Sequence, residues 1–285
     1  MKTAILTDSG CNLPKAYIEK QKNLFVIPLI INIGDESFRD QLEITSQEIY
    51  KDLDEKNIKT SLPKTGDLHD IFEKVKKEGY EALLVINISS GLSGTFNAFR
   101  IEIEQEKDLA ITHYDTKTLG AQQGYIVREA VDLVNKGVET KKIIEALDEL
   151  RYKDSKAYYT IATLKYLRRG GRIGKVEGTI GDLLHIKPVI TVNDEGVYVT
   201  ASKALGIKRS LLNMKNILIE DFGSDLIDLT VHYASDKEKA QELGEILKRS
   251  LSVRNLELSE LTPVLGIHTG PEMFAYVARR VKKSS

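Results

Sequence analysis

The chain has 285 residues, of which 41% are hydrophobic and 29% charged, and its formal net charge is −1. This composition excludes a disordered chain, and the near-zero charge argues against nucleic-acid binding, which normally brings a basic excess. The single cysteine, Cys11, excludes an intramolecular disulfide. No apolar run approaches the roughly 18 residues of a membrane span, and the N-terminus soon turns polar, so we expect a cytoplasmic protein without a signal peptide.

The first half of the sequence alternates strand and helix patterns, which is typical of an α/β sheet with parallel strands. The predicted strands are Thr3–Thr7, Phe25–Ile33, Glu81–Ile88 and Ala110–Tyr114. The predicted helices are Ser46–Leu53 with Ser46 as its N-cap, Asp67–Lys77, Ser93–Glu106, Leu119–Lys136 and Lys141–Lys153. The last of these helices has one apolar face and is expected to cover the sheet edge.

The second half mixes helices with an antiparallel hairpin, which favours an α+β arrangement with a mixed or antiparallel sheet. In chain order the prediction is strand Ala157–Ala162, helix Thr179–His185, hairpin strands Pro188–Asn193 and Val197–Lys203, helix Lys208–Asp221, strand Leu226–Tyr233, helix Asp236–Leu251, strand Pro263–His268 and a helix from Gly270. We therefore expect two domains, residues 1–155 and 156–285, with the final helix able to pack back on the first domain.

A basic, glycine-rich segment runs from Leu167 to Gly178. It comes near a phosphate-binding loop, but its spacing is short, and Val176 stands where a Ser or Thr must bind magnesium. Two interpretations stay open, an exposed loop and a positively charged docking surface. The residues of that surface would be Arg168, Arg169, Arg172 and Lys175.

The five histidines lie too far apart in sequence to form a metal site, and one cysteine adds nothing to them. His268 is the candidate of interest, because it is predicted at the end of a strand, before Thr269-Gly270-Pro271. Strand ends at the carboxyl edge of a sheet are where α/β proteins bind their ligands.

The stretch SSGLSGT, residues 89–95, lies where a predicted strand leads into a helix. Three interpretations fit it. Ser90 or Ser93 can cap the helix. Ser93 can be a hydrolase nucleophile, with Asp115 and His268 following in the order of a Ser…Asp…His triad, although Thr95 replaces the last glycine of G-x-S-x-G. The backbone N–H groups of the helix start, with the hydroxyls of Ser93 and Thr95, can also bind a carboxylate or phosphate.

A second source of hydroxyl groups is Thr60-Ser61, which precedes the helix predicted at Asp67. In a parallel α/β layout this turn and the Ser93 turn fall on the same edge of the sheet. The two turns can therefore serve one site.

With these residues in place, the chain resembles the DegV family of bacterial fatty-acid-binding proteins, which partner a fatty acid kinase. The matching segments occur in family order and span nearly the whole chain. They are TDSGCNLP (7–14), KTSLP (59–63), SSGLSGT (89–95), YDT (114–116), LKYLRRGGRI (164–173), LLHIKPVI (183–190) and GIHTGP (266–271).

The resemblance implies two α/β domains of the EDD fold with a long-chain fatty acid between them. It implies that hydroxyls at Thr60 and Ser93 hold the carboxylate, in a site that also contains Ser61, Gly94, Thr95 and His268. It further implies no cofactor, and a separate ATP-dependent kinase that converts the bound carboxylate to an acyl phosphate for phospholipid metabolism. A transient contact with a membrane surface is compatible with that role.

Three positions depart from the family pattern. Gly10-Cys11-Asn12 replaces the middle of TDSTADLP, Leu62 and Lys64 interrupt TSQPS, and Glu272 replaces the last glycine of HTGPG. None of these changes removes an expected carboxylate ligand. Glu272 does place a charge beside the His268 turn.

The physical argument supports the resemblance. A buried carboxylate needs donors in place of water, and hydroxyls with a helix N-terminus supply them without a buried cation. At about 0.8 kcal/mol per CH₂, a tail of some sixteen carbons gains on the order of 10 kcal/mol before ordering losses, so the tail should dominate affinity. Candidate tail residues, which can equally be plain core, are Leu183, Leu184, Ile186, Val189 and Ile190. The alternative function is a serine hydrolase acting on acyl esters with Ser93 as nucleophile.

Overall fold

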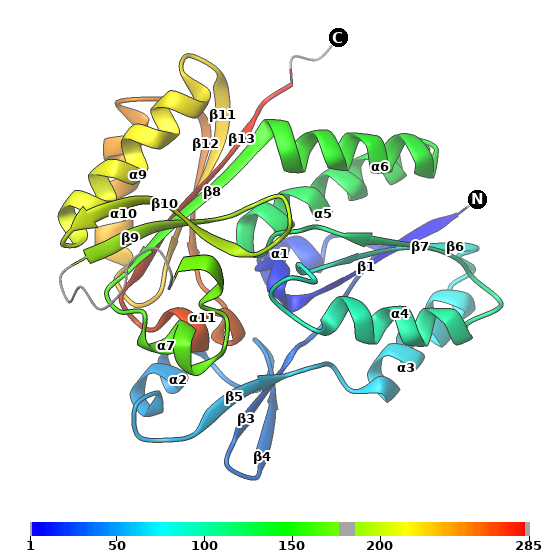
Figure 1. Cartoon of the computed structure of the whole chain (residues 1–285). Coiled ribbons are helices and arrows are strands. Elements are labelled where there is room, and N and C mark those ends of the chain that lie inside the picture. The colour runs from blue at the N-terminus through cyan, green and yellow to red at the C-terminus, as the bar shows by residue number, and fades with distance from the viewer. Residues whose placement is uncertain (1, 177–185, 283–285) are drawn as a thin grey trace.

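The computed structural model describes residues 2–176 and 186–282, and Figure 1 shows the whole chain. Its N-terminal half is built on a parallel sheet with the strand order β2-β1-β6-β7. The strands are β1 (Thr3–Asp8), β2 (Leu24–Ile27), β6 (Ala82–Asn87) and β7 (Ala110–Asp115). All six residues of β6 are buried, as expected for a central parallel strand with both faces covered.

Helices cover both faces of the parallel sheet (Figure 1). Leu6, Leu83 and Val85 pack with α3 (Thr65–Lys77) and α4 (Thr95–Gln105). The alternate strand residues, Ile5 and Leu84 among them, pack with α5 (Gly120–Asn135) and α6 (Thr140–Glu149). A short helix α1 (Lys15–Ile18) follows β1, and a π-helical turn η2 (Leu150–Asp154) follows α6. The predicted strand–helix alternation is confirmed here.

The predicted long strand Phe25–Ile33 is wrong, because it forms two strands in two sheets. β2 ends at Ile27, and β3 (Ile30–Ile33) belongs to an antiparallel sheet of order β4-β3-β5 with β4 (Glu36–Arg39) and β5 (Ile58–Ser61). The break falls at Pro28, which has no N–H to donate to a ladder. Because of this break, β3 leaves the parallel sheet and pairs with β5, which carries Thr60 and Ser61 of the site.

The helix predicted from Ser46 is α2 (Ser46–Asp52), but its N-cap is Thr45. The Thr45 side chain accepts a hydrogen bond from the Glu48 N–H, and the Glu48 carboxylate accepts from the Thr45 N–H at 2.8 Å. This reciprocal pair is a capping box. Ser46 instead donates its hydroxyl to the Leu261 carbonyl, which joins α2 to the C-terminal half.

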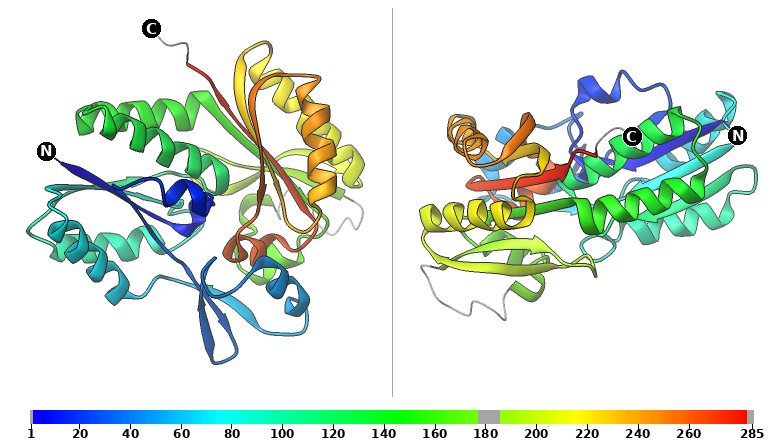
Figure 2. Two further views of the ribbon diagram at one scale, coloured as in Figure 1. Left: turned by 180° about the vertical axis from the view of Figure 1, so that it is seen from behind. Right: turned by 90° about the horizontal axis from the view of Figure 1, so that it is seen from above.

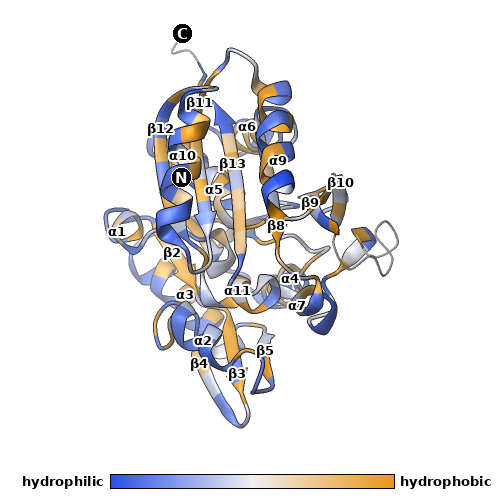
Figure 3. Ribbon diagram, turned by 90° about the vertical axis from the view of Figure 1, so that its left-hand side faces the viewer, coloured by the Kyte–Doolittle hydropathy of each residue, from blue (hydrophilic) through white to orange (hydrophobic). Residues whose placement is uncertain are grey.

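The C-terminal half is built on a six-stranded mixed sheet of order β10-β9-β8-β13-β11-β12. The strands are β8 (Ser155–Ile161), β9 (Ile186–Val192), β10 (Tyr198–Leu205), β11 (Leu226–Tyr233), β12 (Ser252–Glu260) and β13 (Met273–Arg280). The predicted β9–β10 hairpin is confirmed. Helices α9 (Ile207–Phe222) and α10 (Lys237–Lys248) pack on the face turned away from the parallel sheet (Figures 1 and 2). In Figure 3 both helices carry hydrophobic as well as hydrophilic residues, which fits helices with one buried side.

The predicted end of the chain is wrong. Residues Pro263–Thr269 form helix α11, and the segment predicted as a final helix is strand β13, in the middle of the mixed sheet. Pro263 is at the start of the helix, where its fixed φ is favourable, and Gly270 ends it with a φ of +78°. Strand β12 was not predicted. As far as residue 282, where the description ends, the last element is thus a strand and not a helix, and Val277 of β13 contributes to the core around α5.

The fold class is thus confirmed as α/β, with a parallel sheet and a mixed sheet. The predicted domain boundary falls at the start of β8 and stays a prediction. The helix predicted at Thr179–His185 lies outside the described residues. Within the described ranges, no helix combines the length and apolar composition that a membrane span requires.

Candidate functional site

A cavity of about 380 Å³ lies between the mixed sheet and the loops of the N-terminal half. One wall is the inner face of β8 and β13, where Ala157 pairs with Val277 and Tyr159 pairs with Ala275. Opposite them stand Gly120 and Ala121 at the start of α5. Each pair of wall residues contains an alanine, and α5 begins with two small residues. Because these side chains are short, the sheet and the helix leave space between them.

Polar groups gather where β5, the loop before α4 and helix α11 meet. Thr60, Ser61, Ser93, Gly94 and His268 all line the cavity. The Thr60 hydroxyl and His268 Nε2 share a hydrogen bond of 3.0 Å. Ser61 is turned partly aside, since its hydroxyl accepts from the Asn32 amide at 3.0 Å. Thr60 and Ser61 are in strand β5 of the antiparallel sheet and not, as predicted, in a turn at the edge of the parallel sheet, but they line the same cavity as Ser93.

Ser93 lies at the N-terminus of α4. Its Oγ accepts from the Thr95 N–H at 3.2 Å and lies 2.8 Å from the Thr95 hydroxyl. Thr95 is fully buried behind it and does not line the cavity. The predicted cap is therefore shifted: the N-cap of α4 is Gly94, and Ser93, one residue before it, accepts from the first N–H of the helix. This contact leaves Ser93 on the cavity wall, at the positive end of the helix dipole.

His268 is a neutral hydrogen-bonding group. Burial, followed by the positive charges of Arg172 and Arg169, lowers the pKa of His268 to about 4. A neutral imidazole has one donor and one acceptor nitrogen, and Nε2 is used by Thr60. Nδ1 is buried and has no hydrogen-bond partner among the described residues. His268 was predicted at a strand end and is instead on the last turn of α11, but it is in the predicted site.

Arg172 differs from the prediction made for the basic segment. It is half-buried and lines the cavity, and its Nε donates to the Leu92 carbonyl at 3.2 Å. Arg168 and Arg169 are both exposed and form the last two residues of α7 (Lys165–Arg169), and Arg169 also donates to the Leu53 carbonyl at 2.6 Å. A cation therefore stands at the polar end of the cavity, which the sequence argument had not required.

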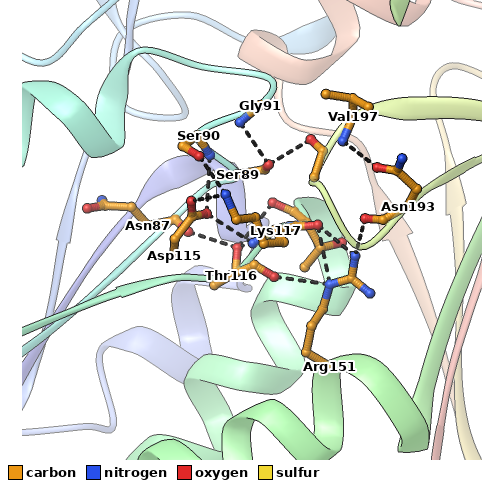
Figure 4. A network of polar contacts seen from close by, with 12 residues as sticks. Asn87, Ser89, Ser90, Gly91, Asp115, Thr116, Lys117, Arg151, Asn193 and Val197 are labelled. Carbon is orange, nitrogen blue, oxygen red and sulfur yellow. Dashed lines mark hydrogen bonds and ion pairs between the residues drawn. The ribbon is translucent and has the colours of Figure 1, made fainter. Parts of the chain in front are cut away.

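A network of polar contacts holds the Ser89–Gly91 turn in place (Figure 4). The Ser89 hydroxyl donates to the Gly196 carbonyl at 2.7 Å, which joins this turn to the tip of the β9–β10 hairpin. A Cβ on Gly91 would lie 2.5 Å from the same carbonyl oxygen, so the approach requires glycine there. The hairpin thus braces the turn that leads to Ser93.

Arg151 of η2 forms the other half of this network (Figure 4). Its guanidinium donates to the carbonyl groups of Thr116, Lys117 and Asn193 at 3.1, 2.8 and 2.9 Å. Asp115 pairs with Lys117 at 2.8 Å and accepts from the Ser90 N–H at 3.2 Å. Among the described contacts, no hydrogen bond joins Asp115, Ser93 and His268 into a triad.

The residues that were predicted to contact the ligand's tail do not line the cavity in the described structure. Leu183 and Leu184 lie outside the described residues. Ile186 and Ile190 belong to the adjoining apolar core and do not line the cavity, and Val189 packs under α9. The apolar wall comes from residues that were not proposed, namely Leu29, Leu92, Leu119, Ala157, Tyr159, Tyr198, Leu265, Met273, Ala275 and Val277. The alternation of cavity-facing residues along β8 and β13 is the sequence signal that could have found this wall. It was missed because β13 had been predicted as a helix.

No cluster of three or more metal-binding side chains occurs in the described ranges. The fold and cavity are those of an α/β protein that binds a ligand with an apolar body and one polar end. The chain belongs to the DegV family, whose profile, described as an uncharacterised protein family, matches residues 2–280. A DegV domain-containing protein of Clostridium perfringens is 37% identical over 272 residues, covering 95% of this chain and 96% of that protein. Another, of Clostridium acetobutylicum, is 35% identical over 276 residues, covering 97% and 98%.

Solved structures show the same fold. A DegV family protein from Thermus thermophilus described as fatty-acid-binding has a TM-score of 0.90 and 28% identity, covering 99% of this chain and all of that one. DegV from Bacillus subtilis, described as a fatty acid binding protein, has a TM-score of 0.89 and 27% identity with the same coverage.

Proposed function

We propose that this protein binds a long-chain fatty acid in the cavity between the mixed sheet and the loops of the N-terminal half. One observation carries the proposal: hydroxyl, imidazole and guanidinium groups gather at one end of a cavity whose remaining lining is mostly apolar. A fatty acid has the matching distribution of polar and apolar groups. The fatty-acid-binding relatives of known structure support the same conclusion.

In this proposal the carboxylate lies among Thr60, Ser93 and Arg172. The two hydroxyls donate to it, the N–H groups near Gly94 at the start of α4 face it, and Arg172 offsets its charge. For Thr60 to donate to the carboxylate, Nε2 of neutral His268 donates to the Thr60 oxygen, and this hydrogen bond fixes that hydroxyl. Ser61 and Thr95 contribute indirectly, since their recorded contacts are with Asn32 and Ser93.

The test is binding of octadecanoic acid to delipidated protein, with Ser93→Ala and Thr60→Val compared with wild type. Each variant should lose roughly 1.5–3 kcal/mol, about 10- to 150-fold in Kd, as expected for a hydrogen bond to a charged group. Binding should persist, because the tail supplies most of the affinity. Ser224→Ala, at an exposed turn residue, is the control and should leave the Kd unchanged. Wild-type protein that binds no fatty acid would refute the proposal.

The second part of the proposal is presentation of the bound fatty acid to a separate ATP-dependent kinase in the cytoplasm. In that reaction a carboxylate oxygen attacks the γ-phosphorus of ATP, the bond to ADP breaks, and an acyl phosphate forms. We assign the kinase contact to Arg168 and Arg169, which are exposed, and no longer to Arg172, which lines the cavity. Arg168→Glu with Arg169→Glu should slow kinase turnover at physiological salt while fatty-acid affinity stays constant. Unchanged turnover would exclude this surface.

No observation favours the hydrolase alternative. Ser93 contacts Thr95, Asp115 contacts Lys117 and Ser90, and His268 contacts Thr60. A serine nucleophile needs a base within hydrogen-bond reach. Covalent labelling of Ser93 by a fluorophosphonate, or ester hydrolysis lost in Ser93→Ala, would restore the alternative.

A further inference from the structure

The cavity opens to solvent at its polar end. Of the described residues that line it, Ser61, Leu62 and Gly94 are exposed, and the others are buried or half-buried. We call the opening at these three residues the mouth. Leu62 is 43% exposed, and a Cβ on Gly94 would lie 3.5 Å from Leu62 Cδ2, so the two residues are neighbours at the mouth. A fatty acid bound at Thr60 and Ser93 therefore has its carboxylate at the mouth and its tail inside.

A surface groove of about 220 Å³, the α3–α4 groove, adjoins the mouth. Its apolar residues are Pro63, Leu68, Ala98, Phe99 and Ile101. Pro63 directly follows Leu62 in the chain, and Ala98 is about one turn of α4 beyond Gly94, so the groove continues the mouth along the protein surface. Ile101, on the next turn of α4, is 44% exposed. An apolar surface thus extends outward from the opening of the ligand cavity.

Exposed cations lie near the mouth. Lys59 is on β5 and exposed to solvent, and Lys64 lines the groove together with the half-buried Glu102. Neither lysine forms an ion pair among the described residues. Helix α7, with the exposed Arg168 and Arg169, leads into the loop that packs on the polar end of the cavity. On a chain whose net charge is −1, this local positive charge favours a partner that carries a polyanion.

We propose that the mouth and the α3–α4 groove form the face on which the ATP-bearing domain of the kinase docks, with an apolar side chain of the kinase in the groove. This inference rests on the proposed function and locates the contact with its partner. Phosphoryl transfer requires the γ-phosphorus of ATP to reach a carboxylate oxygen, and in the described part of the chain the cavity is exposed at the mouth. The kinase must therefore cover Leu62 and Gly94, and the groove is the apolar surface beside them.

The groove and the cations should contribute in different ways. A side chain that fills an apolar pocket and loses its water acts mainly on the lifetime of a complex, and such anchors carry much of the binding energy. Exposed charges act mainly on the rate of encounter, and salt screens them. A change in the groove should therefore weaken the kinase interaction at low and high salt alike. The effect of reversing Arg168 and Arg169 should fade as salt is added.

The experiment uses the protein loaded with octadecanoic acid and a purified ATP-dependent fatty acid kinase. Ile101→Asp should raise the KM for the loaded protein about 10-fold at low and at high salt, as expected for a buried apolar anchor. Its Kd for octadecanoic acid should stay at the wild-type value, because Ile101 does not line the cavity. Ile246→Asp is the matched control, since it makes the same change at a 43% exposed position of α10, and it should leave the KM unchanged.

The outcomes separate this inference from the proposed function. An unchanged KM in Ile101→Asp, or an equal rise in Ile246→Asp, overturns the inference alone. So does an unchanged KM with a wild-type dimer that dissociates in Ile101→Asp, which assigns the groove to a second copy. Vesicles of anionic phospholipid that bind wild type but not Ile101→Asp, again with unchanged KM, assign it to a membrane surface.

Failure at an earlier step has a different signature. Loaded wild type that the kinase does not phosphorylate overturns the kinase part of the proposed function, and this inference with it. Wild type that binds no octadecanoic acid overturns the whole proposed function. An unchanged melting temperature of Ile101→Asp shows that a raised KM comes from the altered surface and not from unfolding.

Discussion

Gly170 and His268 are in direct contact, and the contact depends on the absence of a side chain at Gly170. A Cβ at this position would overlap Nδ1 of the imidazole. The φ of Gly170 is −79°, so alanine is excluded by its neighbour and not by its backbone. The basic loop therefore packs against the histidine that holds Thr60, and it fixes that end of the cavity.

Gly170→Ala should displace His268 and break its hydrogen bond with Thr60. We expect octadecanoic acid to bind about 10-fold more weakly, because the Thr60 hydroxyl would no longer be held by His268 in position to donate to the carboxylate. Gly66→Ala is the matched control, because a Cβ there meets nothing within 4 Å. It should leave the Kd unchanged and stabilise α3 slightly. Equal affinity of the two variants would show that the packing of Gly170 does not matter for binding.

Arg151→Met should loosen the hairpin from the turns that it braces. The buried guanidinium contributes donors to several backbone carbonyl groups, which would be left without partners in the variant. We expect a loss on the order of 3 kcal/mol in the free energy of unfolding, and faster hydrogen exchange at the Gly196 amide.

The control for this change is Arg100→Met, at an exposed position of α4 whose ion pair with Glu104 lies at the surface. It should change stability by less than about 0.5 kcal/mol. If Arg151→Met lowers stability but leaves exchange at the hairpin tip equal to that of wild type, the bracing role is incorrect.

Asp40 should make stability depend on pH. Its Oδ1 accepts from the Val264 N–H at the start of α11, at 3.0 Å, and burial raises its pKa to about 7. Between about pH 4 and 7 the unfolded chain loses the proton first, so the folded state holds more protons and stability falls as pH rises. The contribution is present in full below pH 4 and lost above about pH 7.

Asp40→Asn keeps an acceptor but removes the ionisation. The free energy of unfolding of wild type minus that of the variant should fall by on the order of 1 kcal/mol per pH unit across this window. His268 and His232, whose pKa values are lowered to about 4 by burial, raise stability with pH between 4 and 6.5 in both proteins and cancel in the difference. A pH-independent difference would show that Asp40 is charged throughout.

Cys11 should be unreactive in the native protein. Its side chain is 1% exposed, and burial together with the charge of Asp8 raises the pKa of the thiol to about 12. Because the thiolate is the reacting form, Ellman's reagent should react at pH 8 only as fast as the chain opens, and at once in guanidinium chloride. Ser224→Cys, which adds an exposed thiol, should react within seconds. Equally fast native reaction of Cys11 would contradict its burial.

The parallel sheet was predictable because β1, β6 and β7 are short strand-like segments, each followed by a helix pattern, and β6 is a continuous apolar run. The sequence also predicted, through the family motifs, that Thr60, Ser93 and His268 belong together, and all three line one cavity; their role in binding a carboxylate stays a prediction. The sequence prediction failed at Pro263–Thr269, because the apolar run VLGI fits a strand as well as a short helix. The choice between the two depends on the position of Pro263 in the folded structure. Tyr159 was missed for a related reason. A tyrosine on a strand does not show by its sequence which face of the sheet it occupies.

The central place of β13 has a consequence for biosynthesis. β13 lies between β8 and β11, yet it is the last described strand of the chain. As the polypeptide leaves the ribosome, the parallel sheet can close early, whereas β8 and β11 must wait, each with an open edge, until the final strand arrives between them. During that interval unpaired edges can pair with other chains. The ligand cavity, which has β13 as part of its wall, is completed only when synthesis of that strand ends.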